Sequence, residues 1–117
     1  MIGIRSIAVG VIILALSGAA NAVEPTRIDA STDASTQASW DRMLGESSDH
    51  TKCELRAALV KLNSVAATEQ GFRGIAFHAA LQDPSVIRIR DKIAGFSAQQ
   101  IVEFASQASP GPVVCER

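Results

Sequence analysis

The 117-residue chain is poor in the side chains that most binding and catalytic sites use. It contains no tyrosine, one tryptophan, four phenylalanines, two histidines and two cysteines. It also has no block of lysines and arginines, and its formal net charge is −1. Because binding to nucleic-acid phosphates draws on clustered positive charge, we expect no nucleic-acid partner.

The first 22 residues have the composition of a cleavable signal peptide. Arg5 supplies a positive charge ahead of a nearly unbroken apolar run, residues 7–16. Small residues, Ala20 and Ala22, then occupy the positions that signal peptidase reads, so we expect a cut between Ala22 and Val23. The alternative is a membrane-spanning helix, but the wider, mostly apolar stretch from Ile7 to Ala20 has only about 14 residues, fewer than the roughly 20 that a span needs.

Export implies a particular redox environment and a particular anchoring state. A lipoprotein needs a cysteine at the cut, and the residue there is Val23, so we expect no membrane anchor after cleavage. We predict a periplasmic or secreted protein. In an oxidising compartment Cys53 and Cys115 are expected to form one intramolecular disulfide, with free thiols or pairing between chains as the alternatives.

The mature residues 23–117 are enough for one domain with a small core. Residues 23–33 are rich in small polar side chains and predict a flexible arm. Ser31 is a plausible helix N-cap, which predicts a first helix as far as Leu44 that is ended by Gly45. Trp40 lies at helical spacing within it and is expected to be buried.

The second predicted helix starts at a capping box formed by Thr51 and Glu54, and it carries an apolar stripe between residues 55 and 66. The next stretch, residues 67–82, has no single period. We expect a loop and then a short helix at Ile75–Leu81, with a strand at residues 75–77 as the alternative. Its large apolar side chains are expected to be buried.

Two strong start signals mark the last third of the chain. Asp83 followed by Pro84 predicts a third main helix that begins at Pro84 and ends at Gly95. Ser97 and Gln100 form another capping box, which predicts a final helix ending before Pro110. No pair of strands is evident. The sequence therefore predicts an all-α domain, a small bundle of about four helices that one disulfide clasps.

The corner at residues 93–101 and the opening segment at residues 27–31 resemble an uncharacterised family of small bacterial envelope lipoproteins. Its members typically open with Ile-Asp-small-Ser, here Ile28-Asp29-Ala30-Ser31, and close with Gly-x-Thr/Ser-x-x-x-Ile, here Gly95 to Ile101. The resemblance covers about residues 28–108 and implies a helical envelope protein with no known activity. The chain departs from the family at the cleavage site, and residues 67–82 look inserted.

The candidates for chemistry are few. His50, Cys53 and Glu54 lie on one helical face in a spacing that suits a metal ion, but Cys53 is better explained by Cys115, so we expect no metal and no cofactor. His78 is expected to be a partly buried structural residue. No nucleophile motif or acid–base set accompanies either histidine, and we expect no enzymatic activity.

Arg88, Arg90 and Lys92 form a short basic run that is a candidate interaction surface, although such a run is more commonly the wet side of an amphipathic helix. Export, small size, a disulfide and the missing catalytic set favour a protein that acts by contact with another envelope protein. The alternative is a small periplasmic enzyme or ligand-binding domain that uses His50 or His78. The oligomeric state is left open by the residues.

Overall fold

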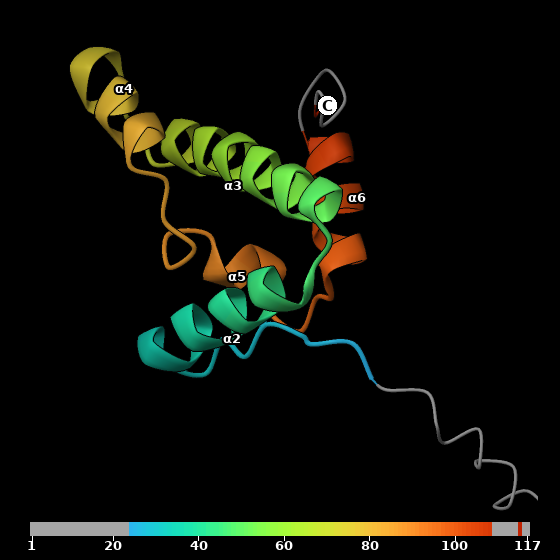
Figure 1. Ribbon diagram of the computed structural model, residues 1–117. Coiled ribbons are helices and arrows are strands. Elements are labelled where there is room, and N and C mark those ends of the chain that lie inside the picture. The colour runs from blue at the N-terminus through green and yellow to red at the C-terminus, as the bar shows by residue number, and fades with distance from the viewer. Residues whose placement is uncertain (1–23, 109–114, 116–117) are drawn as a thin grey trace, which may run out of the picture.

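The computed structural model describes residues 24–108 and residue 115. Five helices are found there, in the order α2 (Asp33–Glu46), α3 (Asp49–Glu69), α4 (Gly74–Gln82), α5 (Arg90–Ile93) and α6 (Ala98–Ala108) (Figure 1). The only β-type pairing in that part of the chain is an isolated antiparallel bridge between Arg27 and Ser97. The predicted all-α class is confirmed, and the short helices α4 and α5 bring the number of helices to five.

The long helix α3 organises the domain. Its main packing partners are α6 and α4, while α2 and α5 lie together across from it (Figure 1). The core between these elements is built from apolar side chains that are nearly inaccessible to water: Ile28, Trp40, Met43, Leu55, Ala58, Leu62, Ala66, Val86, Ile89, Ile93, Ile101 and Ala105. Trp40 is buried there as predicted. In contrast, α4 projects past the C-terminal end of α3, away from this core (Figure 1).

The segment before α2 is packed against the corner between α5 and α6. The Ile28 amide donates to the Phe96 carbonyl at 3.0 Å, and the Gly95 amide donates to the Ile28 carbonyl at 2.9 Å. The Ile28 side chain is only 2% exposed. A flexible arm over residues 23–33 therefore does not describe the chain from Arg27 onward, because one large apolar residue and two backbone hydrogen bonds attach it to the core. Val23 lies outside the described residues.

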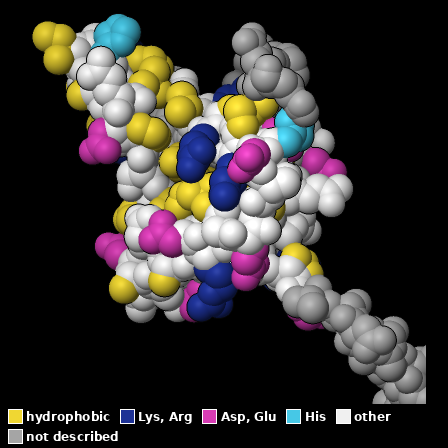
Figure 2. All heavy atoms as spheres, viewed as in Figure 1, with side chains coloured by type: hydrophobic (Ala, Val, Ile, Leu, Met, Phe, Trp, Pro, Cys, Tyr) yellow, Lys and Arg dark blue, Asp and Glu magenta, His cyan; other side chains and the backbone are white. Residues whose placement is uncertain are grey.

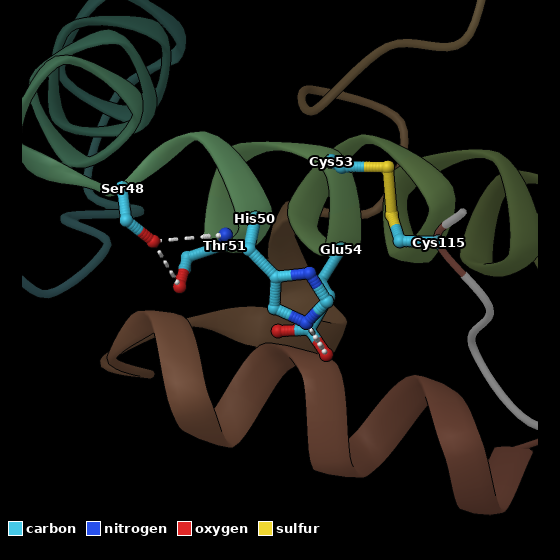
Figure 3. The surroundings of a disulfide bond; sticks show 6 residues. All are labelled: Ser48, His50, Thr51, Cys53, Glu54 and Cys115. Atoms are coloured by element: carbon cyan, nitrogen blue, oxygen red, sulfur yellow. Dashed lines mark hydrogen bonds and ion pairs between the residues drawn. A yellow bond between two sulfur atoms is a disulfide. The ribbon is translucent and has the colours of Figure 1, made fainter. Parts of the chain in front are cut away.

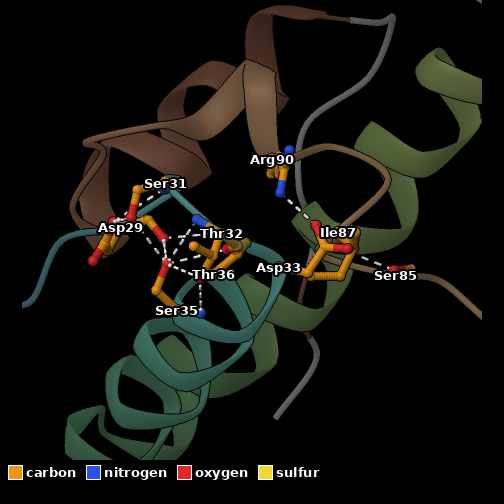
Figure 4. A network of polar contacts seen from close by, with 9 residues as sticks. All are labelled: Asp29, Ser31, Thr32, Asp33, Ser35, Thr36, Ser85, Ile87 and Arg90. Carbon is orange, nitrogen blue, oxygen red and sulfur yellow. Dashed lines mark hydrogen bonds and ion pairs between the residues drawn. The ribbon is translucent and has the colours of Figure 1, made fainter.

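A network of small polar side chains starts α2 (Figure 4). The N-cap is Thr32 rather than the predicted Ser31: its hydroxyl accepts from the Ser35 amide at 2.9 Å, and Ser35 Oγ accepts from the Thr32 amide at 3.0 Å. Ser31 instead donates its hydroxyl to Asp29 Oδ1 at 2.6 Å, and its amide donates to the same oxygen at 3.1 Å. The Ile-Asp-small-Ser segment is thus a turn that presents the helix start.

These bonds hold the pKa of Asp29 below its ordinary value of 3.8, mainly through the Ser31 hydroxyl and then the Ser31 amide. A carboxyl group whose pKa is lowered by folding stabilises the fold at pH values above its ordinary pKa, and this stabilisation is lost as the pH falls through the lowered pKa.

We expect Ser31→Ala to raise the pKa of Asp29, as measured by the carboxyl carbon shift in an NMR titration. Ser106→Ala, at a hydroxyl on α6, is the control and should leave it unchanged. Equal pKa values of Asp29 in Ser31→Ala and the unaltered protein would contradict this reading.

The junction between α2 and α3 differs in detail from the prediction. The helix α2 continues through Gly45 to Glu46, because the Ser47 amide and hydroxyl satisfy the carbonyls of Leu44 and Met43. The N-cap of α3 is Ser48, whose hydroxyl accepts from the Thr51 amide at 3.2 Å. The predicted Thr51–Glu54 capping box was wrong because a competing cap three residues upstream lets the helix begin at Asp49.

The predicted helix from Pro84 was also wrong. Residues 86–89 form turns, and only the four residues of α5 are helical. The cause is Asn63, which is fully buried on α3: its Nδ2 donates to the Ser85 carbonyl and its Oδ1 accepts from the Ser85 amide, both at 3.1 Å. A helix starting at Pro84 needs the Ser85 carbonyl for the amide of Ile89, which bonds to Val86 instead.

We expect Asn63→Ala to lower the free energy of unfolding by about 2 kcal/mol, because it strands buried backbone groups that Asn63 now satisfies. The Arg88 guanidinium, which also donates to Asn63 Oδ1, loses that acceptor too. Urea titration followed by circular dichroism measures the effect. Ser64→Ala, one residue along α3, is the matched control and should stay within about 0.5 kcal/mol. Equal losses in the two variants would rule out this role for Asn63.

The last corner agrees with the sequence. Gly95 has a φ of +78°, a left-handed conformation that favours glycine. The Ser97 amide donates to Gln100 Oε1 at 2.9 Å, and the Gln100 amide donates to Ser97 Oγ at 3.4 Å, so the predicted capping box starts α6. Phe96 packs edge-on against Phe104 with ring centroids 5.7 Å apart. Ala94, which follows the last residue of α5, is exposed.

Candidate functional site

The helix α4 has no charged residue of the Asp, Glu, Lys or Arg type along its nine positions. Two glycines with positive φ, Gly71 at +83° and Gly74 at +56°, redirect the chain after α3 and set α4 off as a separate helix. Its polar side chains are His78 and Gln82, and a helix with so few polar residues is normally enclosed by other elements. This helix is not, since Ala80 is its only buried residue.

Figure 2 shows apolar side chains gathered over α4, at the upper left of the view. Ile75 is 87% exposed, the highest value among large apolar residues in the described part of the chain. We define the α4 patch as the five apolar residues that remain exposed or half-buried: Ile75, Ala76, Phe77, Ala79 and Leu81. Exposed apolar surface on a small domain commonly marks a contact site.

Sequence reasoning missed this patch. It treated the large apolar residues of residues 67–82 as core, yet Phe72, Phe77 and Leu81 are half-buried and Ile75 is almost fully exposed. The signal was present as a short run with no charge and no single helical period. A run of this kind predicts a helix without a charged, solvent-facing side. It does not show whether the helix is covered by its own chain or by another molecule.

A charged residue of opposite sign flanks each end of α4. Arg73 is the N-cap residue and Asp83 is the C-cap residue. Both are exposed, and neither side chain makes a hydrogen bond or ion pair with residues 24–108. Each charge lies at the end of the helix where the helix dipole disfavours it, the cation at the N-terminus and the anion at the C-terminus.

A second feature is an open groove of about 440 Å³ between the first turns of α3 and α6, lined by Thr51, Glu54, Ala98, Gln99, Val102 and Glu103. The imidazole of His50 lies beside it, with Nε2 at 3.4 Å from Glu54 Oε2, and both side chains point toward α6 (Figure 3). Gln99 donates to Glu103 at 3.2 Å. The Thr51 hydroxyl accepts a hydrogen bond from the Ser48 hydroxyl, and among the described residues no base accepts its proton, so the groove presents carboxylates without an activated nucleophile.

His78, the other candidate for chemistry, lies on α4 and is exposed rather than partly buried as predicted. Its ring meets Phe77 edge-on with centroids 6.4 Å apart. The reason is again the projection of α4 beyond the core. The structure therefore separates the two histidines, placing His50 at the start of α3 and His78 on α4.

The basic run at Arg88, Arg90 and Lys92 is engaged within the chain. Arg90 pairs with Asp33 of α2, and Figure 4 shows the two side chains meeting. Lys92 Nζ lies 2.6 Å from Glu69 of α3. With Arg88 on Asn63, each of the three cations joins its segment to another element. An interaction surface at these residues stays a prediction, and a partner has to compete with the bonds already present.

The two cysteines are joined. A disulfide links Cys53, near the start of α3, to Cys115, with Cα atoms 5.9 Å apart and 62 positions apart in sequence (Figure 3). Both cysteines are half-buried.

Across the described residues, no group of three or more His, Cys, Asp or Glu side chains is arranged to hold a metal ion. Between residues 24 and 108, no helix has both the length and the apolarity to cross a membrane.

The predicted signal cleavage between Ala22 and Val23 lies outside the described residues. Comparisons with protein families, curated proteins and solved structures found no match to this chain. Nothing in them bears on the resemblance to envelope lipoproteins. Function is therefore inferred from the leader sequence and from the geometry of the α4 patch, the groove and the disulfide.

Proposed function

We propose that the chain is exported by a signal peptide and acts in the bacterial cell envelope by protein–protein contact through the α4 patch. Export is supported by the leader, with Arg5, the apolar run at residues 7–16 and the small residues Ala20 and Ala22. It is also supported by the disulfide, since such bonds form and persist mainly in oxidising compartments. The mature protein is then periplasmic or secreted.

One observation carries the contact function: Ile75 is 87% exposed on a helix that has no charged residue. Leaving a large aliphatic side chain in water forgoes about 1.5–3 kcal/mol relative to burying it. Ile75 is flanked on α4 by the exposed small residues Ala76 and Ala79 and the half-buried Phe77 and Leu81, which favours a surface that another protein covers. Aromatic residues such as the half-buried Phe77 are enriched in contact hot spots.

Export is tested by recovering the protein from the periplasmic fraction of its host and measuring its intact mass. We expect a chain that begins at Val23 and has no thiol open to alkylation until it is reduced. A full-length chain in the cytosol with two open thiols overturns the localisation. Neither outcome decides the contact function, which has its own test.

Contact is tested by placing a photo-crosslinking amino acid at Ile75 and exposing cells to light. We expect a discrete adduct whose partner is identified by mass spectrometry. The same probe at Arg56, exposed on α3 far from α4, is the control and should give none. The probe at Glu103 reports on the groove. No adduct from Ile75 overturns the proposal, and an adduct from Glu103 alone moves the contact to the groove.

The second candidate function is a small enzyme or ligand-binding domain, and it has one favouring observation, the His50–Glu54 pair beside the groove. The two functions separate by mutation. Under the contact function, Ile75→Asp removes the crosslinked partner that a probe at Phe77 captures, while His50→Gln leaves that adduct unchanged. Loss of the adduct with His50→Gln favours the groove instead.

A further inference from the structure

We infer that the α4 patch pairs with the α4 patch of a second copy of this chain, the two helices lying antiparallel about a two-fold axis. This inference rests on the proposed function, because it assumes that α4 is a contact surface, and it adds the identity of the partner. Three properties of the described residues lead to it: the apolar surface of α4, the opposite charges at its two ends, and the position of these charges relative to the helix dipole.

The chemistry of the α4 surface suits a second copy of the same helix. The patch offers apolar area and no Asp, Glu, Lys or Arg between residues 74 and 82. A partner that buries it must present no unpaired charge at the centre of the contact, because a buried unpaired charge is costly. A second α4 meets this condition. In a two-fold contact the same patch serves both partners, so no other complementary surface is required.

The two charges at the ends of α4 are complementary between copies. Arg73 and Asp83 have opposite signs, are both exposed, and have no ion pair within residues 24–108. Antiparallel pairing places Arg73 of one copy beside the partner's Asp83, and the symmetry makes this pair twice. Parallel pairing places like charges together. The end charges therefore select the antiparallel arrangement.

The helix dipole of α4 also favours pairing between copies. Within one chain, Arg73 and Asp83 each lie at the helix end that the dipole disfavours. In the antiparallel pair, each is met by an opposite charge, and the two helix dipoles also oppose one another. Pairing between copies thus relieves an unfavourable arrangement that the single chain retains.

An anionic lipid membrane is the alternative partner for the α4 patch, and the charges flanking α4 favour it less than a second copy. Helices that bind such surfaces carry several lysines or arginines on their polar face. The segment at residues 73–83 has Arg73 alone, offset by Asp83.

The contact between two copies is small, because a nine-residue helix is only about 14 Å long. We expect a weak, reversible dimer with an interface at the low end of the usual size range.

The experiment is analytical ultracentrifugation of the protein purified from the periplasm, from low micromolar to near-millimolar concentration. We expect a monomer–dimer equilibrium that Ile75→Asp abolishes. Circular dichroism of Ile75→Asp should match the unaltered protein, since the Ile75 side chain adds little to the core. Persistence of the dimer in folded Ile75→Asp overturns the inference, as does a monomer at every concentration.

A charge-swap series tests the antiparallel order. Arg73→Asp and Asp83→Arg should each weaken the dimer roughly five- to tenfold, because each replaces two attractive pairs by two repulsive ones. The double variant Arg73→Asp/Asp83→Arg should restore the original dissociation constant. Arg56→Asp, a charge reversal in the first half of α3 and away from α4, is the matched control and should have no effect. A double variant no better than the singles overturns the arrangement.

Failure of this inference is distinguishable from failure of the proposed function. A monomer in the ultracentrifuge, together with an Ile75 adduct to a different protein, overturns the second copy and leaves contact through α4 standing. Binding of a monomer to phosphatidylglycerol vesicles that Ile75→Asp removes overturns both in favour of a lipid surface. An Ile75 adduct at twice the mass of the chain supports both.

Discussion

Removing the Cys53–Cys115 disulfide should lower the free energy of unfolding by about 4 kcal/mol in the chain-entropy model, because the bond closes a long loop in the unfolded chain. The two cysteines are 62 positions apart. Domains of this size have a total stability of roughly 5–15 kcal/mol, so the loss takes a large share of it. Urea unfolding of Cys53→Ala/Cys115→Ala, compared with the oxidised protein, measures the difference.

Reductant provides the control for this prediction. Dithiothreitol should destabilise the unaltered protein to about the same extent as the double substitution and should not change the double variant. A loss under about 1 kcal/mol would contradict the chain-entropy account. It would mean that the unfolded chain is already compact enough for the bond to add little. The result also bears on compartment, because a protein this dependent on its disulfide is poorly suited to a reducing cytosol.

Leu62→Ala should destabilise the domain by about 2–5 kcal/mol, the range for removing a large buried aliphatic side chain from a well-packed core. Leu62 has no exposed surface, and it lies on α3 in the cluster shared with α5 and α6. The lost methyl groups forfeit transfer free energy, and the cavity left behind costs more. Thermal and urea unfolding followed by far-ultraviolet circular dichroism measure both the midpoint and the slope.

Val60→Ala is the matched control, on the same helix and two residues away. Val60 is 41% exposed, so its removal should cost well under 1 kcal/mol. The contrast depends on the apolar stripe of α3 facing the core on one side only. Similar losses of stability in the two variants would contradict the difference in burial between Leu62 and Val60. They would mean that the Val60 side chain packs against something other than residues 24–108.

Much of the fold could be predicted because its signals are local. The capping box of Ser97 and Gln100 satisfies amides within three residues of each other, and Gly95 supplies the left-handed turn before it. The disulfide had a single possible intramolecular pairing because the chain has two cysteines. Where competing local signals were close together, the choice went wrong: Thr32 took the cap expected of Ser31, and Ser48 took the cap expected of Thr51.

The candidate site was much harder to predict. The sequence suggested that Arg88, Arg90 and Lys92 are either a candidate interaction surface or the wet side of an amphipathic helix. It did not reveal their partners, which lie on α2 and α3, between 23 and 57 positions away. The α4 patch was taken for core, because apolarity alone does not say which surface covers a helix. Nothing within residues 74–82 distinguishes burial inside the domain from contact between molecules.

Local chemistry in the chain by itself determined the helical class, the start of α6 and the disulfide, because caps, glycine turns and a lone cysteine pair depend on neighbouring residues or on residue counts. Only the tertiary structure decided what became of the segment after Pro84, where Asn63 takes both backbone groups of Ser85 from 22 positions away. It also decided that α4 projects into water. Both outcomes depend on which distant elements come into contact, and that is a property of the packed chain.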